Sequence, residues 1–269
     1  MTTTALKLRI TPPTLLGGRA RLVIERNVMV YKHVWIIFFS GFFEPLFYLF
    51  AARVGIGRLV GDLRDASGHK VAYAAFVAPA LMAASAMNGA VYESTMNIYF
   101  KLKFAKTYDG MLATPIEPFD IALGEIGWSL TRGAFYAIGF LIVMAVSGLL
   151  HSPLAILSVP TALLTGFAFA AVGMAATTYM RSWQDFDLVT MFVLVLFLFS
   201  ATFYPLTVYP PALRIVAQIS PLYHSVTLIR AFTLGVVGPD LLWHAGFLMV
   251  MGAVGLRVAA RRLRLILTP

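Results

Sequence analysis

Six long runs of apolar residues dominate the sequence. They lie at residues 34–52, 72–98, 122–149, 154–180, 186–204 and 241–260. A helix needs about 20 consecutive apolar residues to cross the hydrocarbon core of a bilayer, and Gly or Pro within such a helix is tolerated. The pattern therefore predicts an all-α membrane protein whose six transmembrane helices form one domain over residues 34–260.

The segment before the first run is polar and has a weak amphipathic pattern. Over residues 14–32, Arg21, Glu25 and Lys32 share one side of a helical wheel. A segment of this kind is typical of a helix that lies in the membrane interface and leads into a span. We therefore expect an interfacial helix within an N-terminal region of residues 1–33.

The segment between the second and third runs, residues 101–114, is also amphipathic. Its apolar helical face consists of Phe104, Tyr108, Met111 and Leu112. Such a helix either rests on the membrane surface or docks a cytoplasmic partner, and the pattern leaves both interpretations open. The residues Thr114-Pro115-Ile116-Glu117 fit a capping box with Pro at the first helical position, and they predict the start of a new helix.

The stretch between the fifth and sixth runs is too apolar for an ordinary loop. Prolines interrupt residues 205–234, so that no piece of this stretch is long enough to span a bilayer. A pair of short re-entrant helices on the outer side explains the pattern best. Non-helical backbone at that depth must be covered by protein or line a wet cavity, which predicts an outer plug or gate.

Composition and charge add the environment and the orientation. Charged residues make up 12% of the 269 residues and apolar residues 59%, with a mean hydropathy of +0.82; a soluble domain carries about 25% charged residues. Four segments on one side of the membrane carry most of the Lys and Arg residues: six in the N-terminal segment, three in the 98–120 loop, one in the 181–187 loop and four in the tail. The segments on the opposite side carry six.

The positive-inside rule then places both termini in the cytoplasm, including a basic tail over residues 261–269. The net charge of +9 follows from these cytoplasmic segments and requires no nucleic-acid partner. The short loops and the absence of cysteine suit a bacterial inner membrane, where membrane lipid is the immediate neighbour.

Asp187 and Arg257 lie near the cytoplasmic ends of their predicted spans, and the candidate intramembrane charges are Glu44, Glu93, Glu125 and Arg132. Because the second and third spans are antiparallel neighbours, Glu93 and Arg132 should reach a similar depth, and we expect them to form an ion pair. Glu125 lies seven residues before Arg132 and so shares its helical face. Structural pairing is favoured over a role in transport. Glu44 precedes Pro45, which favours a kink in the first span.

Motifs for catalysis and metal binding are missing from the sequence. It contains no GxxxxGKS or GxxxxGKT phosphate-binding loop, no HExxH and no GxSxG. The five histidines, His33, His69, His151, His224 and His244, are scattered over loops and span ends, and we interpret them as isolated interfacial residues. The sequence therefore predicts no catalytic residue, metal or cofactor in this chain.

Several short blocks carry a family resemblance. They are Glu44-Pro45, residues 108–115, 120–125, 199–205 and 221–224, and Arg230. Together they resemble the permease subunits of type-2 ABC exporters, in the branch of the nodulation lipo-oligosaccharide exporters and bacterial drug-resistance permeases. The resemblance runs from residue 14 to residue 262. It implies that 101–114 is a cytoplasmic coupling helix and that 205–234 forms outer re-entrant helices.

The resemblance also implies partners. Two permease subunits, identical or different, would enclose the pathway, and each would rest on an ATPase subunit that binds ATP and magnesium. Phe104, Tyr108, Met111 and Leu112 would then couple to the ATPase. The outer gate would comprise Tyr204, Pro205, Tyr209, Pro221, Tyr223, His224 and Arg230.

These features together predict ATP-driven export of an amphipathic substrate, such as a glycolipid, a lipid-linked saccharide or a hydrophobic drug. The spans are apolar and aromatic and carry few fixed charges. One alternative is a proton-coupled secondary carrier that uses Glu44, Glu93 and Arg132, which inverted repeats would favour. Another is a membrane-embedded transferase, which clustered carboxylates or histidines at one interface would favour. The sequence displays neither pattern.

Overall fold

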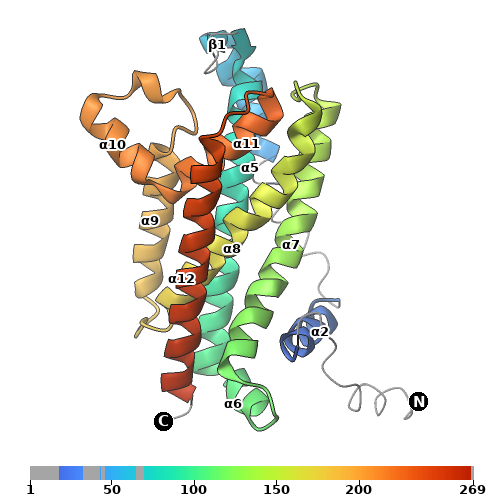
Figure 1. Cartoon of the computed structure of the whole chain (residues 1–269), viewed down its shortest axis with the longest axis vertical. Coiled ribbons are helices and arrows are strands. Elements are labelled where there is room, and N and C mark those ends of the chain that lie inside the picture. Colours follow the sequence, from blue (N-terminus) through green and yellow to red (C-terminus); the bar gives the residue numbers. More distant parts are fainter. Residues whose placement is uncertain (1–17, 33–42, 44–45, 65–69, 268–269) are drawn as a thin grey trace.

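The computed structural model describes residues 18–32, 43, 46–64 and 70–267. Within them the chain is almost entirely helical, and the long helices run side by side in a bundle (Figure 1). The elements through α7 are, in chain order, α2 (Ala20–Tyr31), a π-helix (Ala52–Ile56), α4 (Gly57–Val60), β1 (Asp62–Arg64), β2 (Lys70–Ala72), α5 (Tyr73–Tyr92), two π-helices (Glu93–Asn97 and Phe100–Phe104), α6 (Thr107–Leu112) and α7 (Pro118–Val146). They are followed by a 3-10 helix (Pro153–Leu157), α8 (Ser158–Thr177), α9 (Asp185–Phe199), a 3-10 helix (Leu206–Val208), α10 (Pro211–Ile219), α11 (Pro221–Leu234) and α12 (Leu241–Leu267).

Four helices of the described residues are long and apolar enough to cross a membrane. The first, Tyr73–Phe104, joins α5 to the two π-helices that follow it; the second is α7, the third is α8 with its preceding 3-10 turn, and the fourth is α12. They confirm the predicted spans at 72–98, 122–149, 154–180 and 241–260.

The other two predicted spans have a different status. The first, over residues 34–52, lies largely outside the described residues, which are helical from residue 46 to residue 60. The fifth, predicted over 186–204, is α9, a helix of only 15 residues. It ends early because the chain leaves helical geometry at Ala201, whose φ of +54° lies in the left-handed region.

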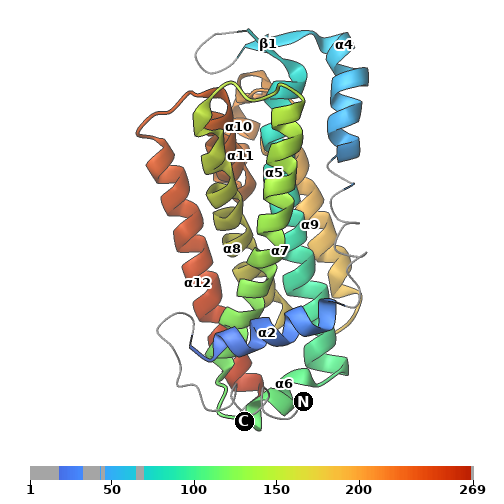
Figure 2. The ribbon, with the colours of Figure 1, turned by 90° about the vertical axis from the view of Figure 1, so that its right-hand side faces the viewer.

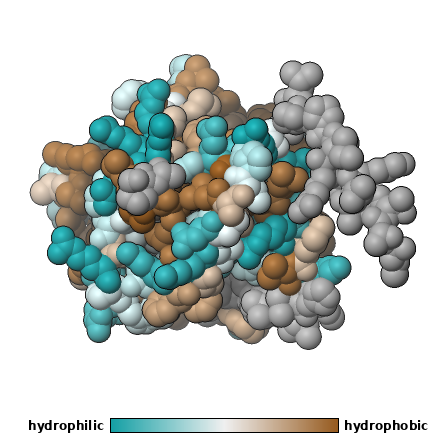
Figure 3. Space-filling view, turned by 90° about the horizontal axis from the view of Figure 1, so that it is seen from below, coloured by the Kyte–Doolittle hydropathy of each residue, from teal (hydrophilic) through white to brown (hydrophobic). Residues whose placement is uncertain are grey.

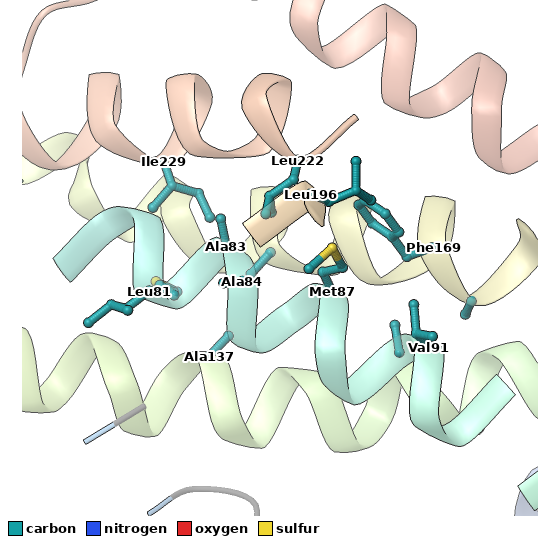
Figure 4. Close-up of a cluster of buried hydrophobic side chains, with 14 of the residues drawn as sticks. Leu81, Ala83, Ala84, Met87, Val91, Ala137, Phe169, Leu196, Leu222 and Ile229 are labelled. Atoms are coloured by element: carbon teal, nitrogen blue, oxygen red, sulfur yellow. The ribbon is translucent and has the colours of Figure 1, made fainter. Parts of the chain in front are cut away.

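Helix α5 forms the centre of the bundle. Most of its side chains are buried, and many are alanines that allow neighbouring helices to approach closely. Figure 4 shows its Leu81, Ala83, Ala84, Met87 and Val91 among Ala137 of α7, Phe169 of α8, Leu196 of α9, and Leu222 and Ile229 of α11. Apart from Ser85 and Asn88, the side chains of α5 are almost all apolar, because protein surrounds this helix on nearly all sides.

Helix α2 lies across the lower ends of the long helices instead of along them (Figure 2). It packs against α7 at Gly124, where an added Cβ would lie 2.5 Å from the Cβ of Val23 and 2.7 Å from the carbonyl oxygen of Ala20. Its other side exposes Val28, Met29 and basic residues. This crosswise, amphipathic placement is the one expected of an interfacial helix.

Gly124→Ala is expected to separate α2 from α7. The new Cβ meets backbone and cannot be relieved by a side-chain rotation, so we expect a loss of about 1–3 kcal/mol in stability. The matched control is Gly133→Ala on the same helix, where an added Cβ meets nothing within 4 Å; it should be neutral or stabilising by up to about 1 kcal/mol. Thermal unfolding in detergent measures both, and equal melting temperatures would contradict the close contact.

The predicted all-α class is confirmed, and one short strand pair that the pattern did not predict lies at one end of the bundle. Strands β1 and β2 form an antiparallel hairpin in which Asp62 pairs with Ala72 and Arg64 with Lys70. The hairpin lies at the end of the molecule opposite α6 (Figure 1). Both strands contact α5, Val71 is buried in the core, and pairing between the strands satisfies backbone groups of this segment.

The prediction of a single amphipathic helix over residues 101–114 is wrong. Residues Phe100–Phe104 form a π-helix that continues the second span, and the chain then turns at Lys106, whose φ is +45°. Only the six residues of α6 form a separate helix. The predicted apolar face is therefore divided: Phe104 is 62% exposed, whereas Tyr108 and Met111 are buried in this chain's own core.

The predicted capping box lies three residues later than expected. Glu117 is the N-cap of α7, Pro118 occupies the first helical position, and Asp120 accepts a hydrogen bond from the backbone N–H of Glu117. The hydroxyl of Thr114 instead donates to the carbonyl oxygen of Met111. A second Pro with an acidic residue before it outcompetes the Thr-Pro pair, because Asp120 supplies the reciprocal bond.

The stretch of residues 205–234 contains two short helices, as the prolines predict. Helix α10 begins at the Pro210-Pro211 pair and exposes most of its residues, whereas α11 begins at Pro221 and packs against α5, α8 and α12. With nine and 14 residues, neither is long enough to span a bilayer.

Candidate functional site

A cavity of about 680 Å³ opens between α5, α7 and α9. Aromatic side chains form much of its wall: Tyr31, Tyr48, Tyr92, Phe100, Tyr136, Trp183 and Phe197. Polar side chains are interspersed among them: Ser85, Asn88, Glu93, Asn97, Arg132 and Thr190. Its volume falls in the range of about 300–1,000 Å³ that is typical of small-molecule sites. The lining belongs to elements that are far apart in the sequence, so the bundle itself creates the cavity.

Glu93 and Arg132 form an ion pair in the wall of this cavity, with Nη1 of Arg132 donating to Oε2 of Glu93. Glu93 is the first residue of the π-helix Glu93–Asn97, and Arg132 lies on α7. Their side chains are 9% and 18% exposed. The structure confirms the pair predicted from their depths. π-Helical turns inside α-helices are frequent at functional sites, because the extra residue redirects the side chains.

Tyr31 and Asn97 hold the Glu93 carboxylate from the other side. The Asn97 amide donates to Oε1 at 2.6 Å, and the Tyr31 hydroxyl donates to the same oxygen at 3.4 Å. Burial, and then the charge of Glu93, raise the pKa of Tyr31 to about 12, so this phenol keeps its proton at neutral pH. Arg132 in turn donates to the hydroxyl of Tyr136 at 3.3 Å. Both charges are thus compensated within the wall.

The rest of the wall offers unused hydrogen-bonding capacity beside aromatic surface. The side-chain oxygen of Asn88 is buried and accepts no hydrogen bond from the described residues. Aromatic rings bury large apolar areas and also stack against planar or saccharide groups, and Tyr adds a polar hydroxyl. The cavity can therefore take a molecule with an apolar part and an uncharged polar part.

A second buried ion pair lies where α2, α6 and α7 meet the end of the second span. The Lys101 ammonium donates to both carboxylate oxygens of Glu125, at 2.7 and 2.9 Å. Asn27 of α2 donates to Oε2 at 2.9 Å, and Tyr108 of α6 donates to Oε1 at 3.3 Å. Glu125 is only 2% exposed, and burial is the main cause that raises the pKa of Tyr108 well above its usual value.

This network connects four elements through one carboxylate. A displacement of α6 must move Tyr108, and through Glu125 it acts on Lys101 and Asn27, since a buried charge cannot give up its partners without a large cost. Arg19 also bonds the carbonyl oxygen of Pro115, which ties the start of α2 to the linker after α6. Hydrogen bonds to Glu125 and to Pro115 therefore connect α2 and α6 at this end of the bundle.

At the opposite end, Arg230 of α11 supports the break in α9. Its guanidinium donates to the carbonyl oxygens of Phe76 and Ala201, at 3.1 and 3.0 Å, and lies over the ring of Phe76. The N–H of Ala201 donates to the hydroxyl of Tyr209, whose ring contacts that of Tyr204. Arg230, Tyr209 and Tyr204 of the predicted gate are thus brought together around non-helical backbone.

The other predicted gate residues gather in a second place. Nδ1 of His224 lies 2.6 Å from Nδ1 of His244 on α12, and the ring of Tyr223 packs beside both. The expectation of isolated histidines is therefore wrong for this pair, because the α11–α12 contact brings together residues that are 20 positions apart. Pro221 begins α11, and Pro205 precedes the 3-10 turn at Leu206–Val208.

Two predicted intramembrane charges remain, Glu125 and Glu44. Glu125 pairs with Lys101 and not with Arg132, although it shares a helix face with Arg132. Glu44 and Pro45 lie outside the described residues. The sequence reasoning missed Lys101 because that residue was assigned to a loop; the available signal was the length of the second apolar run, which allows the helix to continue past residue 98.

Long apolar helices around an aromatic cavity with an internally neutralised ion pair define the class: a helical membrane protein with an internal binding cavity. The described residues contain no group of three or more His, Asp or Glu that could hold a metal. Residues 19–234 match the family described as ABC-2 type transporter, and the chain belongs to that family. It is accordingly a transport subunit of the kind that works with an ABC ATPase and normally has no ATPase site of its own.

Relatives of known name agree with this assignment. "Nodulation protein J" of Rhizobium leguminosarum bv. viciae is 31% identical over 251 residues, which are 92% of this chain and 95% of that protein. The protein of the same name from R. leguminosarum bv. trifolii is 33% identical over 231 residues, 85% of this chain and 86% of that protein. "Inner membrane transport permease YadH" of Escherichia coli (strain K12) is 28% identical over 200 residues, 72% and 74% of the two chains.

Proposed function

We propose that this chain is the permease subunit of an ATP-driven exporter that moves an amphipathic substrate, such as a glycolipid, a lipid-linked saccharide or a hydrophobic drug, out of the cytoplasm or the inner leaflet. It crosses a bacterial inner membrane six times with both termini in the cytoplasm. Two ATPase subunits bind ATP and magnesium, and a second permease subunit, identical or different, completes the pathway. The cavity beside Glu93 and Arg132 is the observation that carries this proposal.

The chemistry of the cavity fits such a substrate. Its wall has seven aromatic side chains, and its only described charged pair is already neutralised by mutual contact. An ionic substrate would have to break that pair, whereas an uncharged polar group can bond Asn88 and leave the pair intact. The apolar part of the substrate then lies against the aromatic rings.

Coupling to the ATPase is assigned to the turn between the second and third spans. Phe104 is exposed there, and Leu112 is half-buried, whereas Tyr108 and Met111 hold α6 to the bundle. In this proposal the ATPase contacts and displaces Phe104 and the exposed side of α6, and the Glu125 network transmits the displacement to α2, to α7 and to the end of the second span at Lys101. Transport results because the ATP-bound and ATP-free partners stabilise different arrangements of the helices.

The face of α9 is assigned to the second permease subunit. Only Phe186 and Leu196 of its 15 residues are buried, and it exposes Leu188, Phe192 and Val195. A helix with so few contacts to the described part of its own chain gains packing from a neighbour. Because α9 also lines the cavity, a second subunit here would close the open side of the cavity and enlarge the pathway.

The break after α9 is assigned to the outer gate. Re-entrant α10 and α11 cover this end, and the carbonyl and N–H of Ala201 are held by Arg230 and Tyr209, so the unwound backbone is satisfied without continuous helix. The proton-coupled alternative receives no support, since Glu93 and Arg132 neutralise each other and the family assignment is to ABC-2 transporters.

Phe104→Asp is expected to uncouple the permease from its partner. In the proposed complex the ATPase covers the Phe104 side chain. Losing an apolar side chain that is buried at an interface costs about 1.5–3 kcal/mol, which lowers the affinity for the ATPase about tenfold or more. The measurement is substrate-stimulated ATP hydrolysis by the co-purified complex. Val237→Asp, a similarly exposed apolar position in the loop between α11 and α12, is the matched control and should retain stimulation. Unchanged stimulation in the Phe104 variant would remove this coupling assignment.

A further inference from the structure

A groove runs along the outside of α12 where this helix packs on α8. It has a volume of about 640 Å³ and an apolar lining that includes Val172 and Ala175 of α8 and Trp243, Val250 and Val258 of α12. Its lining from residue 243 to residue 258 extends over about 22 Å of helix, which exceeds the ~15 Å depth of one leaflet. The groove is exposed: Trp243 is 70% and Val250 63% accessible.

The groove continues into positive charge at the lower end of α12. Arg261 and Arg262 follow Val258 at i+3 and i+4, and Tyr179 follows Ala175 at i+4 after α8, so these three residues extend the same two helix faces. The guanidinium of Arg262 lies 4.2 Å over the ring of Tyr179. Figure 3 shows that hydrophilic and hydrophobic side chains alternate on this lower face of the molecule.

Neither arginine is neutralised by the described part of the chain. Nε of Arg262 is buried and has no hydrogen-bond partner there, and Arg261 is exposed. The ion pairs among the described residues involve other basic residues, namely Arg21, Lys101 and Arg132. A partly buried guanidinium that stacks on an aromatic ring keeps its charge and presents a planar set of donors that matches a phosphate.

We propose that the α8–α12 groove binds one anionic phospholipid. An acyl chain lies along Val172, Val250 and Val258, and the phosphate accepts hydrogen bonds from Arg261 and Arg262 beside Tyr179. The site is separate from the transport cavity, since the two linings share no residue. The bound lipid would connect α8 to α12 on the surface that α9 and the cavity do not use.

The combination of features selects a lipid over the other occupants of such a surface. An acidic protein would neutralise the arginines and leave the apolar groove uncovered, and free phosphate would use none of the groove. A second copy of the chain across a two-fold axis would bring the Arg261 and Arg262 sets toward each other, where like charges repel. Only an amphiphile with a negative headgroup satisfies both parts at once.

Native mass spectrometry of the delipidated, purified permease tests the proposal with two probes of identical acyl chains, dioleoylphosphatidylglycerol and dioleoylphosphatidylcholine. We expect tighter binding of the anionic lipid. Each arginine near an anionic lipid surface contributes about fivefold in affinity, so Arg261→Gln with Arg262→Gln should weaken phosphatidylglycerol binding about 25-fold. Binding of phosphatidylcholine, whose choline cation offsets the charge of its phosphate, should weaken less than binding of phosphatidylglycerol, and millimolar inorganic phosphate should not compete.

Arg58→Gln is the matched control, because Arg58 is exposed and belongs to α4, which contributes no residue to the groove. It should leave phosphatidylglycerol binding unchanged, and Arg262→Lys should retain most of it if the double variant folds poorly. Val254→Trp, which fills the groove, should weaken both lipids. Equal affinity for the two lipids, an equal effect of Arg58→Gln, competition by phosphate alone, or a dimer that Val254→Trp dissociates would overturn the proposal.

Discussion

Glu125→Gln is expected to destabilise the permease more than any other single neutralising change discussed above, by about 3–5 kcal/mol. The carboxylate of Glu125 is the common partner of Lys101, Asn27 and Tyr108. The amide keeps the shape of the side chain but leaves the Lys101 ammonium buried without a counter-charge. It also presents an N–H group where donors already point at the carboxylate, so at least one donor loses its acceptor.

The matched control for this change is Glu25→Gln on α2. Glu25 pairs with Arg21 four residues away, and the two side chains are 28% and 61% exposed. An exposed pair of this kind contributes about 0–1 kcal/mol, because water solvates the charges when the pair is broken. Thermal unfolding of both variants in the same detergent separates the two cases, and a similar loss for both would show that burial of the Lys101–Glu125 pair is not what stabilises this end.

Exchanging Glu93 and Arg132 is expected to recover folded protein that either single reversal loses. Glu93→Arg brings two guanidinium groups together in the cavity wall, and Arg132→Glu brings two carboxylates together; each buries an uncompensated charge at a cost of about 3–5 kcal/mol. The double variant restores opposite charges on the π-helix Glu93–Asn97 and on α7. Residues in direct contact show coupling energies of about 0.5–3 kcal/mol, so recovery should be partial.

The measurement for this pair is the monodisperse fraction after detergent extraction, arranged as a double-mutant cycle. Partial recovery is expected because Asn97 and Tyr31 donate to Glu93 and will not find an acceptor in the same place after the exchange. A double variant that folds no better than the single variants would refute the structural role of the pair. Arg132→Lys keeps the charge and serves as the control for the loss of guanidinium geometry.

Local sequence features predicted the parts of the fold that the bilayer imposes. A helix in hydrocarbon must satisfy its backbone hydrogen bonds internally and present apolar side chains. Each span therefore appears in the sequence as a run of about 20 apolar residues. The same regularity made the Glu93–Arg132 pair predictable. A fixed rise along antiparallel helices converts sequence position into depth, and two charges at one depth on adjacent spans pair because isolation is costly.

Amphipathic faces were less informative, because lipid, a partner and the chain's own core all accept an apolar side chain. Phe104 and Tyr108 belong to one predicted face, yet one is exposed and the other buried, since the turn at Lys106 rotates α6 relative to the π-helix before it. The Lys101–Glu125 network has the same origin. Extension of the second span through residue 104 carries Lys101 out of the presumed loop and places it beside α7.

The sequence by itself thus determined the membrane class, the positions of four long spans and the Pro-broken segment after α9, since each depends on local composition or on the helical rise. Only the tertiary structure decided which polar groups share a site: the cavity wall, the Glu125 network, the His224–His244 contact and the arginines at the end of the α8–α12 groove. These contacts depend on how helices rotate and cross, and that is set by packing at residues such as Gly124 and Gly255 which carry no chemical signal of their own.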